Sequence, residues 1–342
     1  MTAVNNMYTG TSSSNERAMS HTNMNYVNSL QSAFLLGYLD KSPGTSGTRT
    51  ETRQRMLYEM ANARVWNVQQ QINWDMSKRS SAFPECKSND PLDAYQPYQS
   101  LSREQRRALS WHRHAMELSD ILHGEQAALL LSAQLLSVVP TPASRLFMSS
   151  QVSDEARHVD FFIQYMVAAK LPVSAPNNQL ARLIHDALQS PELRYKFSVC
   201  QVLIESLALA RFRELKSISS IPALQQGLAL ILQDEARHVK FGTDTLHEAF
   251  ADLTPEEREL RGSHLLRSAL LLIDTTHSSA ALAREGRWDA AHLRLHLRQY
   301  RIRHPEIARQ RLRQLSLNMS SAGLMTDNVR KRFERITNPT NS

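Results

Sequence analysis

One hexapeptide occurs twice in this chain and constrains its fold more than any other feature. Residues 154–159, with the sequence DEARHV, return unchanged as residues 234–239. Each copy is preceded by a single glutamate in an apolar run, 30 positions before the copy's own glutamate. Two Glu…Glu-x-x-His sets of this kind are the ligand pattern of a dinuclear metal site in a four-helix bundle. The candidate metal ligands are Glu125, Glu155, His158, Glu205, Glu235 and His238.

The spacing within each set suits an antiparallel helical hairpin. In Glu-x-x-His the two ligands lie at positions i and i+3, so they share one face of a helix. The stretch between the two glutamates of a set has room for two legs of roughly 12 residues, each about 18–20 Å long. Proline-containing turns stand at the required places, in residues 140–142 and 219–222. We therefore expect both glutamates of a set to reach one level of the bundle.

A single Glu-x-x-His pair is usually a solvated helix face, but that interpretation does not account for this repeat. It explains neither two identical hexamers nor the position of Glu125 and Glu205 in leucine-rich runs. A carboxylate that is buried without a compensating partner destabilises the fold by several kcal/mol. We therefore expect both upstream glutamates to meet a bound cation.

The rest of the chain predicts an all-α fold. Glycine (10) and proline (13) are scarce among 342 residues, and long stretches are rich in Leu, Ala, Gln and Arg, which favours helix. We expect a metal-binding four-helix bundle over residues 103–251, with additional N- and C-terminal helices. Ser102, Thr141 and Thr254 are the expected N-caps. The expected helices span residues 50–78, 103–138, 142–170, 178–189, 191–217, 222–251 and 254–278, followed by two or three shorter arginine-rich helices. In the first of them the residues expected to face inward are Met56, Met60, Ala63, Val65 and Val68.

The domain organisation is expected to be simple. A flexible N-terminal segment, residues 1–29, is rich in Asn, Ser and Thr and lacks the apolar core of a signal peptide. Residues 30–335 form one domain, and no apolar run reaches the roughly 18 residues that a membrane span needs. Two cysteines, Cys86 and Cys200, make no disulfide framework, so a cytoplasmic location is expected.

The ligand set itself favours particular metals. Carboxylates with two imidazoles suit iron or manganese, whereas zinc sites use more His and Cys and close tetrahedrally. Six protein ligands shared between two ions also leave coordination positions open, where dioxygen can bind. The residues alone do not separate two iron ions from a manganese–iron pair.

The repeated Asp-Glu-x-Arg-His motif with its single upstream glutamates resembles the ferritin-like di-iron carboxylate oxidases and oxygenases. This superfamily includes ribonucleotide reductase small subunits, the hydroxylase subunits of soluble methane and toluene monooxygenases, acyl-carrier-protein desaturases and p-aminobenzoate N-oxygenase. The resemblance covers roughly residues 103–250 and implies a ferritin-like bundle in which the six residues above bind two metal ions.

The resemblance also implies roles for the charged residues beside the ligands. Asp154 is expected to accept a hydrogen bond from His238, and Asp234 from His158. Such a carboxylate fixes the imidazole tautomer and raises its basicity. Arg157 and Arg237 would neutralise these aspartates; the alternative for each arginine is an ordinary ion pair at the surface or between helices.

Three positions depart from particular members of the superfamily. Phe162 stands where radical-bearing ribonucleotide reductase subunits usually place tyrosine, and Tyr165 is three residues further on. Leu209 replaces the threonine of the multicomponent hydroxylases, and Ile231 replaces the third histidine of the N-oxygenase. These residues disfavour a tyrosyl-radical role and a close match to the methane or toluene enzymes, and they predict that the seventh ligand of the N-oxygenase is absent.

The combined interpretation is an O2-activating non-haem di-iron oxygenase that hydroxylates or N-oxygenates a small organic substrate. A radical-generating oxidase like the ribonucleotide reductase small subunit is the alternative, followed by a ferroxidase or iron-binding protein. Residues one turn from the ligands are small or apolar and are candidates for a substrate pocket, although ordinary packing explains them equally well. These candidates are Ala128, Leu129, Ala208, Leu209 and Phe212.

The sequence also indicates which partners to expect. It holds neither an Fe–S cysteine set nor a GxGxxG dinucleotide motif, so electrons come from a ferredoxin or reductase. Net charge is +7, and residues 284–313 contain nine arginines against three acidic residues. This region is either a solvated amphipathic helix or a docking surface for an acidic electron donor or a substrate-bearing acidic carrier protein. Nucleic acid is not expected, because aromatic stacking residues do not interleave the arginines; a homodimer is expected.

Overall fold

The computed structural model describes residues 48–77, 79, 82–85, 90–274 and 278–338. The expectations for the segment 1–29 and for Cys86 fall outside these residues. Across the described ranges the fold is all-α, as predicted, and the one β contact is an isolated bridge between Glu85 and Ser219. No helix within them combines the length and apolar character needed to cross a membrane.

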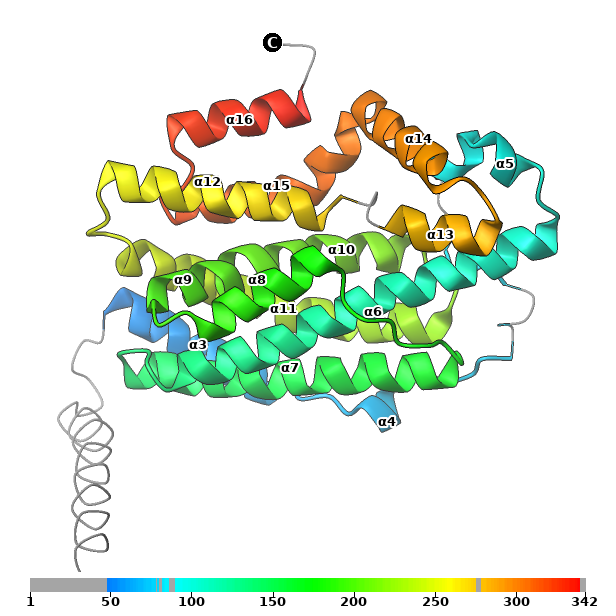
Figure 1. Ribbon diagram of the computed structural model, residues 1–342. Coiled ribbons are helices and arrows are strands. Elements are labelled where there is room, and N and C mark those ends of the chain that lie inside the picture. Colours follow the sequence, from blue (N-terminus) through cyan, green and yellow to red (C-terminus); the bar gives the residue numbers. More distant parts are fainter. Residues whose placement is uncertain (1–47, 78, 80–81, 86–89, 275–277, 339–342) are drawn as a thin grey trace, which may run out of the picture.

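Two helical hairpins form the central bundle, with α6 packed on α7 and α10 packed on α11 (Figure 1). Three of these helices end within two residues of the limits predicted from the sequence. The bundle helices are α6 (Arg103–Leu136), α7 (Pro142–Ala168), α10 (Glu205–Ile218) and α11 (Pro222–Ala249).

The third ligand-bearing segment is not the single α-helix of residues 191–217 that we expected. It begins as α9 (Leu193–Phe197), continues as a π-helical segment (Ser198–Ile204) and becomes α10 only at Glu205. Every residue of the π segment is buried. Short π-helical stretches are rare and are frequent at functional sites. Nothing in the hydrophobic pattern distinguishes this stretch from an ordinary buried helix.

Capping side chains set the starts of the helices, as predicted. The Ser102 hydroxyl accepts a hydrogen bond from the backbone N–H of Gln105, whose side chain accepts in return from the N–H of Ser102 at 2.8 Å. Thr141 caps α7 in the same way, and Thr254 caps α12 (Pro255–Leu272). Such reciprocal bonds satisfy backbone donors that have no partner inside the helix.

The expected N-terminal helix is shorter than predicted, and its inward face was wrong. The helix α3 (Arg49–Ala63) ends at Ala63, and only the four-residue α4 (Val68–Gln71) follows it. The buried face of α3 includes Gln54, whose Nε2 donates to Thr245 Oγ1 at 3.0 Å. A polar residue thus turns inward because α11 supplies its partner, which a hydrophobic pattern does not reveal. The residues wrongly expected inside, and exposed here, are Met56, Met60, Ala63 and Val65.

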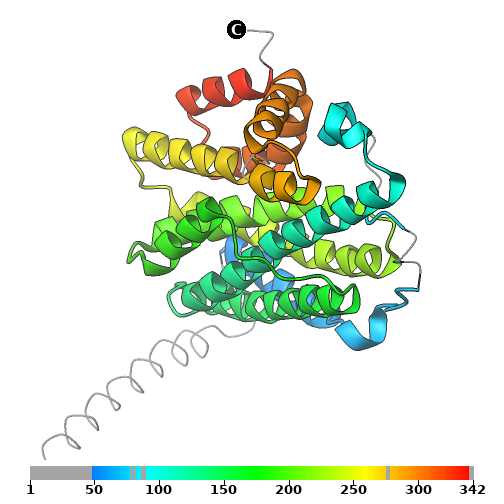
Figure 2. The same cartoon turned by 45° about the vertical axis from the view of Figure 1, so that its right-hand side comes forward.

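Further helices cover the second hairpin and connect the two (Figures 1 and 2). The crossover between the hairpins contains α8 (Asn178–Gln189), as expected. After α12, the described residues form four helices in place of the two or three predicted, and α15 packs along α10. Figure 1 shows this C-terminal layer on the side of the bundle away from α7. The four helices are α13 (Ser279–Gly286), α14 (Ala290–Arg303), α15 (Pro305–Ser321) and α16 (Asp327–Thr337).

One glycine in this outer layer is expected to be necessary for the fold. A Cβ at Gly262 on α12 would lie 2.2 Å from the backbone oxygen of Leu324. Because backbone cannot move aside cheaply, Gly262→Ala is expected to lower the free energy of unfolding by about 1–3 kcal/mol. Gly124→Ala on α6 is the matched control, since nothing lies within 4 Å of its Cβ position and alanine favours helix. Urea denaturation measures both; equal stabilisation by the two changes would contradict the prediction.

Candidate metal centre

The six candidate ligands of the repeated motif converge inside the bundle. None of them is more than 2% exposed. The rings of the two histidines, which lie 80 positions apart in the sequence, have centroids 6.0 Å apart. All four bundle helices contribute: Glu125 from α6, Glu155 and His158 from α7, Glu205 from α10, and Glu235 and His238 from α11.

The ligand atoms fall into two groups, each compact enough to hold one ion. Within each group one donor atom per residue lies within 4.8 Å of the others. Glu155 and Glu235 belong to both groups. One group adds Glu125 and the histidine of the first hexamer, and the other adds Glu205 and the histidine of the second. The arrangement therefore has two bridging and two terminal carboxylates.

The spacing around His158 is that of a coordination shell. Its Nδ1 lies 3.0 Å from Glu125 Oε2, 3.4 Å from Glu155 Oε2 and 3.3 Å from Glu235 Oε1. One imidazole nitrogen cannot donate its single proton to three carboxylates. Donor atoms that are each about 2.1 Å from one ion, at right angles, lie about 3 Å apart. An ion at the centre of these atoms explains their convergence.

Three atoms of the site have no hydrogen-bond partner among the described residues. They are Oε2 of Glu155, Oε2 of Glu235 and Nδ1 of His238. Buried polar atoms without a partner are rare, and a metal ion is an ordinary reason for them. The four ligand carboxylates carry four negative charges, which two divalent cations would balance. The cluster fits a dinuclear site, and its oxygen-rich donor set suits iron or manganese.

Burial strongly opposes ionisation of these carboxylates when no cation is bound. It raises the pKa of Glu125 to about 7, even though a hydrogen bond with His158 acts in the opposite direction. Burial, together with the neighbouring charge of Glu205, raises the pKa of Glu235 well above its usual range. A bound cation favours the charged form of both groups and so removes this penalty.

Two aspartates hold the outer nitrogens of the histidines. His158 Nε2 lies 3.2 Å from Asp234 Oδ2, and His238 Nε2 lies 3.2 Å from Asp154 Oδ2. Each Nε2–H therefore donates across the bundle to the aspartate of the other hexamer, which leaves Nδ1 as the nitrogen directed at the ligand cluster. Such a bond fixes the tautomer that a metal requires.

The arginines of the hexamers balance the two aspartates. Arg237 is 3% exposed and bonds both Asp234 and Asp154, the latter at 3.1 Å. Arg157 bonds Asp154 and is less buried. Sequence reasoning missed a further partner, Trp66, whose Nε1–H donates to Asp234 Oδ2 at 2.7 Å. No local pattern links Trp66 to the motif, because the residue lies in the loop between α3 and α4.

Comparison with known protein families agrees with this geometry. A family model described as P-aminobenzoate N-oxygenase AurF matches residues 47–316, which is more than half of the chain and includes the whole bundle. The chain belongs to the AurF family. Among curated proteins, no match to the sequence was found.

Solved structures show the fold that this AurF-family protein adopts. One point mutant of an R2-like ligand-binding oxidase with a Mn/Fe cofactor has a TM-score of 0.55 and 18% identity, covering 83% of this chain and 96% of its own. A second point mutant of an R2-like ligand-binding oxidase has a TM-score of 0.52 and 19% identity, with coverages of 78% and 92%. At such identities the similarity concerns the fold, and it confirms the expected ferritin-like bundle.

The AurF-family chain keeps an apolar side at its centre. Ile231, at the position of the N-oxygenase's third histidine, is fully buried in one core cluster with Phe162 and Phe212. The candidate pocket residues do not gather in one place. Ala128 belongs to a different core cluster, with Phe147 and others, and Leu129 is half-buried. Ala208 packs against the cluster of Phe212, and Leu209 is buried.

Two buried glutamines beside the ligands were also missed. Gln151 Nε2 donates to Glu205 Oε1 at 2.7 Å, and Gln201 Nε2 donates to Gln151 Oε1 at 2.9 Å. A signal for them exists in the sequence, because each stands four residues before a ligand glutamate, on the same helical face. Cys200 is fully buried, as expected for a small core residue, and burial raises the pKa of its thiol.

A second buried polar cluster lies further along the bundle. Tyr165 is fully buried, and its hydroxyl lies 3.3 Å from Nε2 of His114. His114 Nδ1 in turn lies 2.8 Å from Glu85 Oε1. Burial, aided by the charge of Glu85, raises the pKa of Tyr165 well above its usual range.

This shift predicts that Tyr165 lowers stability at high pH. The unfolded chain loses the phenolic proton near pH 10 and the folded chain does not, so the unfolded state gains as pH rises above 10. Between pH 9 and 11 the wild type is expected to lose about 1.4 kcal/mol more unfolding free energy than Tyr165→Phe. Denaturation of both proteins at the two pH values measures the difference, and identical losses would refute it.

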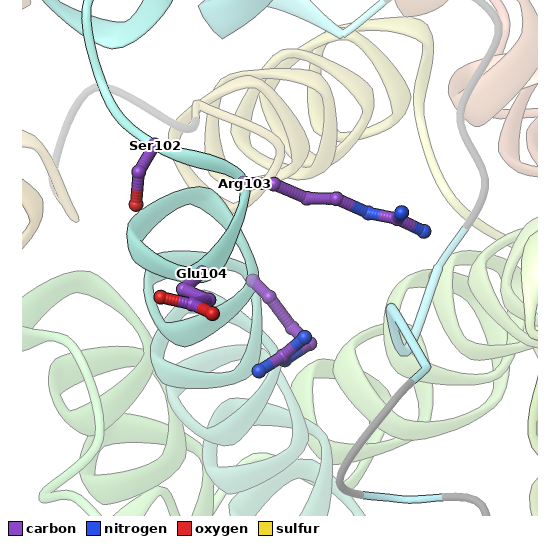
Figure 3. A pocket seen from close by; sticks show the side chains of 4 residues that line it. Ser102, Arg103 and Glu104 are labelled. Atoms are coloured by element: carbon purple, nitrogen blue, oxygen red, sulfur yellow. The ribbon is translucent and has the colours of Figure 1, made fainter.

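A surface hollow at the start of α6 is separate from the metal centre. Figure 3 shows the side chains of Ser102, Arg103 and Glu104 around it, and Arg107 completes the lining. At roughly 1.5 Å per residue, Ser102 lies about 35 Å along α6 from Glu125. A molecule in this hollow would not reach the ligand cluster.

Proposed function

We propose that this protein is a dimetal oxygenase that transfers one oxygen atom from O2 to the nitrogen of a small amine. The carrying observation is the pair of ligand groups that share Glu155 and Glu235 in a fully buried core. The family is described by an N-oxygenase, which supports nitrogen rather than carbon as the target. The apolar residues around Ile231 suit an uncharged organic substrate and keep bulk water away.

The protein's own residues supply position and charge for this reaction. The four glutamates and two histidines would hold two ferrous ions, or manganese and iron, which when bound supply the electrons that reduce O2. Asp154 and Asp234 orient the imidazoles, and Arg237 keeps both aspartates charged in the interior. A primary amine, O2, two protons and two electrons give a hydroxylamine and one water. An external donor supplies the electrons.

The test follows oxygen atoms into a product. Protein reconstituted with Fe(II) is given 18O2, a chemical reductant and a panel of primary arylamines, and products are analysed by mass spectrometry. We expect an 18O-labelled hydroxylamine or its oxidation products, and none from Glu155→Ala. Oxygen uptake with only a tyrosyl radical by electron paramagnetic resonance, or with stored ferric iron alone, would contradict the proposal in favour of a radical oxidase or a ferroxidase.

The basic surface of the C-terminal layer is where we propose that an acidic electron-donor protein docks. The helices that carry these arginines include α15, which packs on α10, the helix of Glu205. A donor bound there is therefore one helix away from a ligand-bearing helix. Arg311 is occupied with Glu214, but most of the set faces solvent. The exposed members are Arg284, Arg287, Arg294, Arg298, Arg301, Arg303, Arg309 and Arg313.

Charge reversal tests this docking surface. Arg298→Glu is expected to slow reduction by an acidic ferredoxin roughly threefold to tenfold at low ionic strength, because it weakens electrostatic steering. The difference shrinks as salt screens the charges. Arg64→Glu is the control, since Arg64 is exposed at the end of α3, which packs on α7 and α11. Equal slowing by the two variants, or a rate that ignores salt, would count against this surface.

A further inference from the structure

A chain of two buried glutamines leads away from the ligand cluster and ends in an unused acceptor. Gln151 on α7 is fully buried, and Gln201 in the π segment is 1% exposed. Gln151 Nε2 lies 2.7 Å from Glu205 Oε1 and 3.4 Å from Glu155 Oε1. Gln201 Nε2 donates to Gln151 Oε1 at 2.9 Å. The chain therefore starts on two ligand carboxylates.

Chemistry fixes the orientation of both amides. A ligand carboxylate only accepts hydrogen bonds, so Gln151 must present its NH2 group to Glu205. The carbonyl of Gln151 then faces Gln201, which must also present its NH2 group. Gln201 Oε1 is left as a buried acceptor with no hydrogen-bond partner in the described part of the chain. An acceptor left in this state is costly, and a bound donor would satisfy it.

The glutamines break the symmetry of the repeat. They stand one turn before two of the four ligand glutamates, whereas Ile121 and Ile231 stand one turn before the other two. Because the helices of each hairpin are antiparallel, the isoleucines lie at the opposite end of the ligand cluster. Metal binding alone needs no such difference between the ends. A bound organic molecule, polar at one end, does.

Local backbone features give Gln201 its place. A Cβ at Gly242 on α11 would lie 3.2 Å from Gln201 Oε1 and 3.1 Å from its backbone oxygen. Glycine therefore lets the amide lie against the backbone of α11. The π segment, which ends just before Glu205, carries Gln201 to this position.

We infer that Gln201 Oε1 accepts a hydrogen bond from the N–H of a primary amine substrate and so selects amines at this centre. The inference rests on the proposed function and narrows it to substrates that keep an N–H donor. Gln151 acts as a positioning residue, since it ties the orientation of Gln201 to Glu205. Substrates with no N–H donor gain nothing from this acceptor.

Binding without turnover tests the inference. Calorimetry under anaerobic conditions compares aniline with N,N-dimethylaniline on the Fe(II)-loaded protein. Gln201→Met keeps the length of the side chain and removes the acceptor; it is expected to weaken aniline binding roughly tenfold and leave dimethylaniline unchanged. Ile121→Met, the same new residue at the opposite end, is the control and should alter neither affinity. Metal content of each variant is measured alongside.

Each outcome decides the matter. A selective loss of aniline supports the inference, even if no amine is oxygenated in the turnover assay, where only the proposed function would then fail. Unchanged preference between the two amines in Gln201→Met, or no binding of aniline by the wild type, overturns it, whether or not amines are oxygenated. If Gln201→Met does not load metal, Gly242→Ala displaces the same amide and is expected to give the same selective loss.

Discussion

Glu155→Ala is expected to reduce bound iron from about two ions per chain to about none, whereas Glu205→Ala is expected to keep about one. The difference follows from the geometry, because Glu155 belongs to both ligand groups and Glu205 to only one. Loss of the shared carboxylate removes a ligand from each ion and leaves one negative charge fewer between them. Anaerobic reconstitution with Fe(II), desalting and elemental analysis measure the iron that remains.

A matched control and two clear failures accompany this prediction. Glu285→Ala removes an exposed carboxylate on α13 and is expected to keep both ions. Full occupancy in Glu205→Ala would overturn the ligand assignment itself. Loss of both ions from Glu205→Ala, to the same extent as from Glu155→Ala, would leave the ligands in place but contradict the division into bridging and terminal carboxylates.

Asp234→Asn is expected to weaken binding of the ion at His158 about 10–100-fold, although the side chain keeps its shape. Asp234 accepts hydrogen bonds from His158, Trp66 and Arg237. Burial acts to raise the pKa of Asp234, but hydrogen bonds from His158 and Trp66 hold it below its usual range, so the group is charged. Asparagine offers one acceptor oxygen and turns an NH2 group toward donors. Competition with a chelator during Mn(II) binding measures the affinity.

Companion variants separate the orienting role from a general loss of stability. Asp154→Asn is expected to weaken the other ion, because Asp154 holds His238. Trp66→Phe removes one of the donors to Asp234 and is expected to have a smaller effect. Asp244→Asn makes the same change on α11 away from the centre, where the carboxylate pairs with Lys240 and Arg53. If that variant bound Mn(II) as weakly as Asp234→Asn, the orienting role would be disproved.

Short-range information carried most of the fold. The capping residues at Ser102, Thr141 and Thr254 act within three residues of themselves, so the starts of α6, α7 and α12 could be read directly. The face of α3 could not, because Gln54 turns inward only to meet Thr245, which is 191 positions away. Hydrophobic patterns report average preference, and a specific long-range hydrogen bond overrides it.

By itself, the sequence determined the six candidate ligands, since Glu-x-x-His places two donors on one helical face and equal gaps bring two hairpins to one level. Tertiary structure decided which carboxylates are shared, that Trp66 and Arg237 support the aspartates, and that a π segment turns Gln201 toward Gln151. The physical reason is that these contacts join separate helices. Spacing along one helix fixes a direction, whereas contact across the bundle depends on how four helices pack.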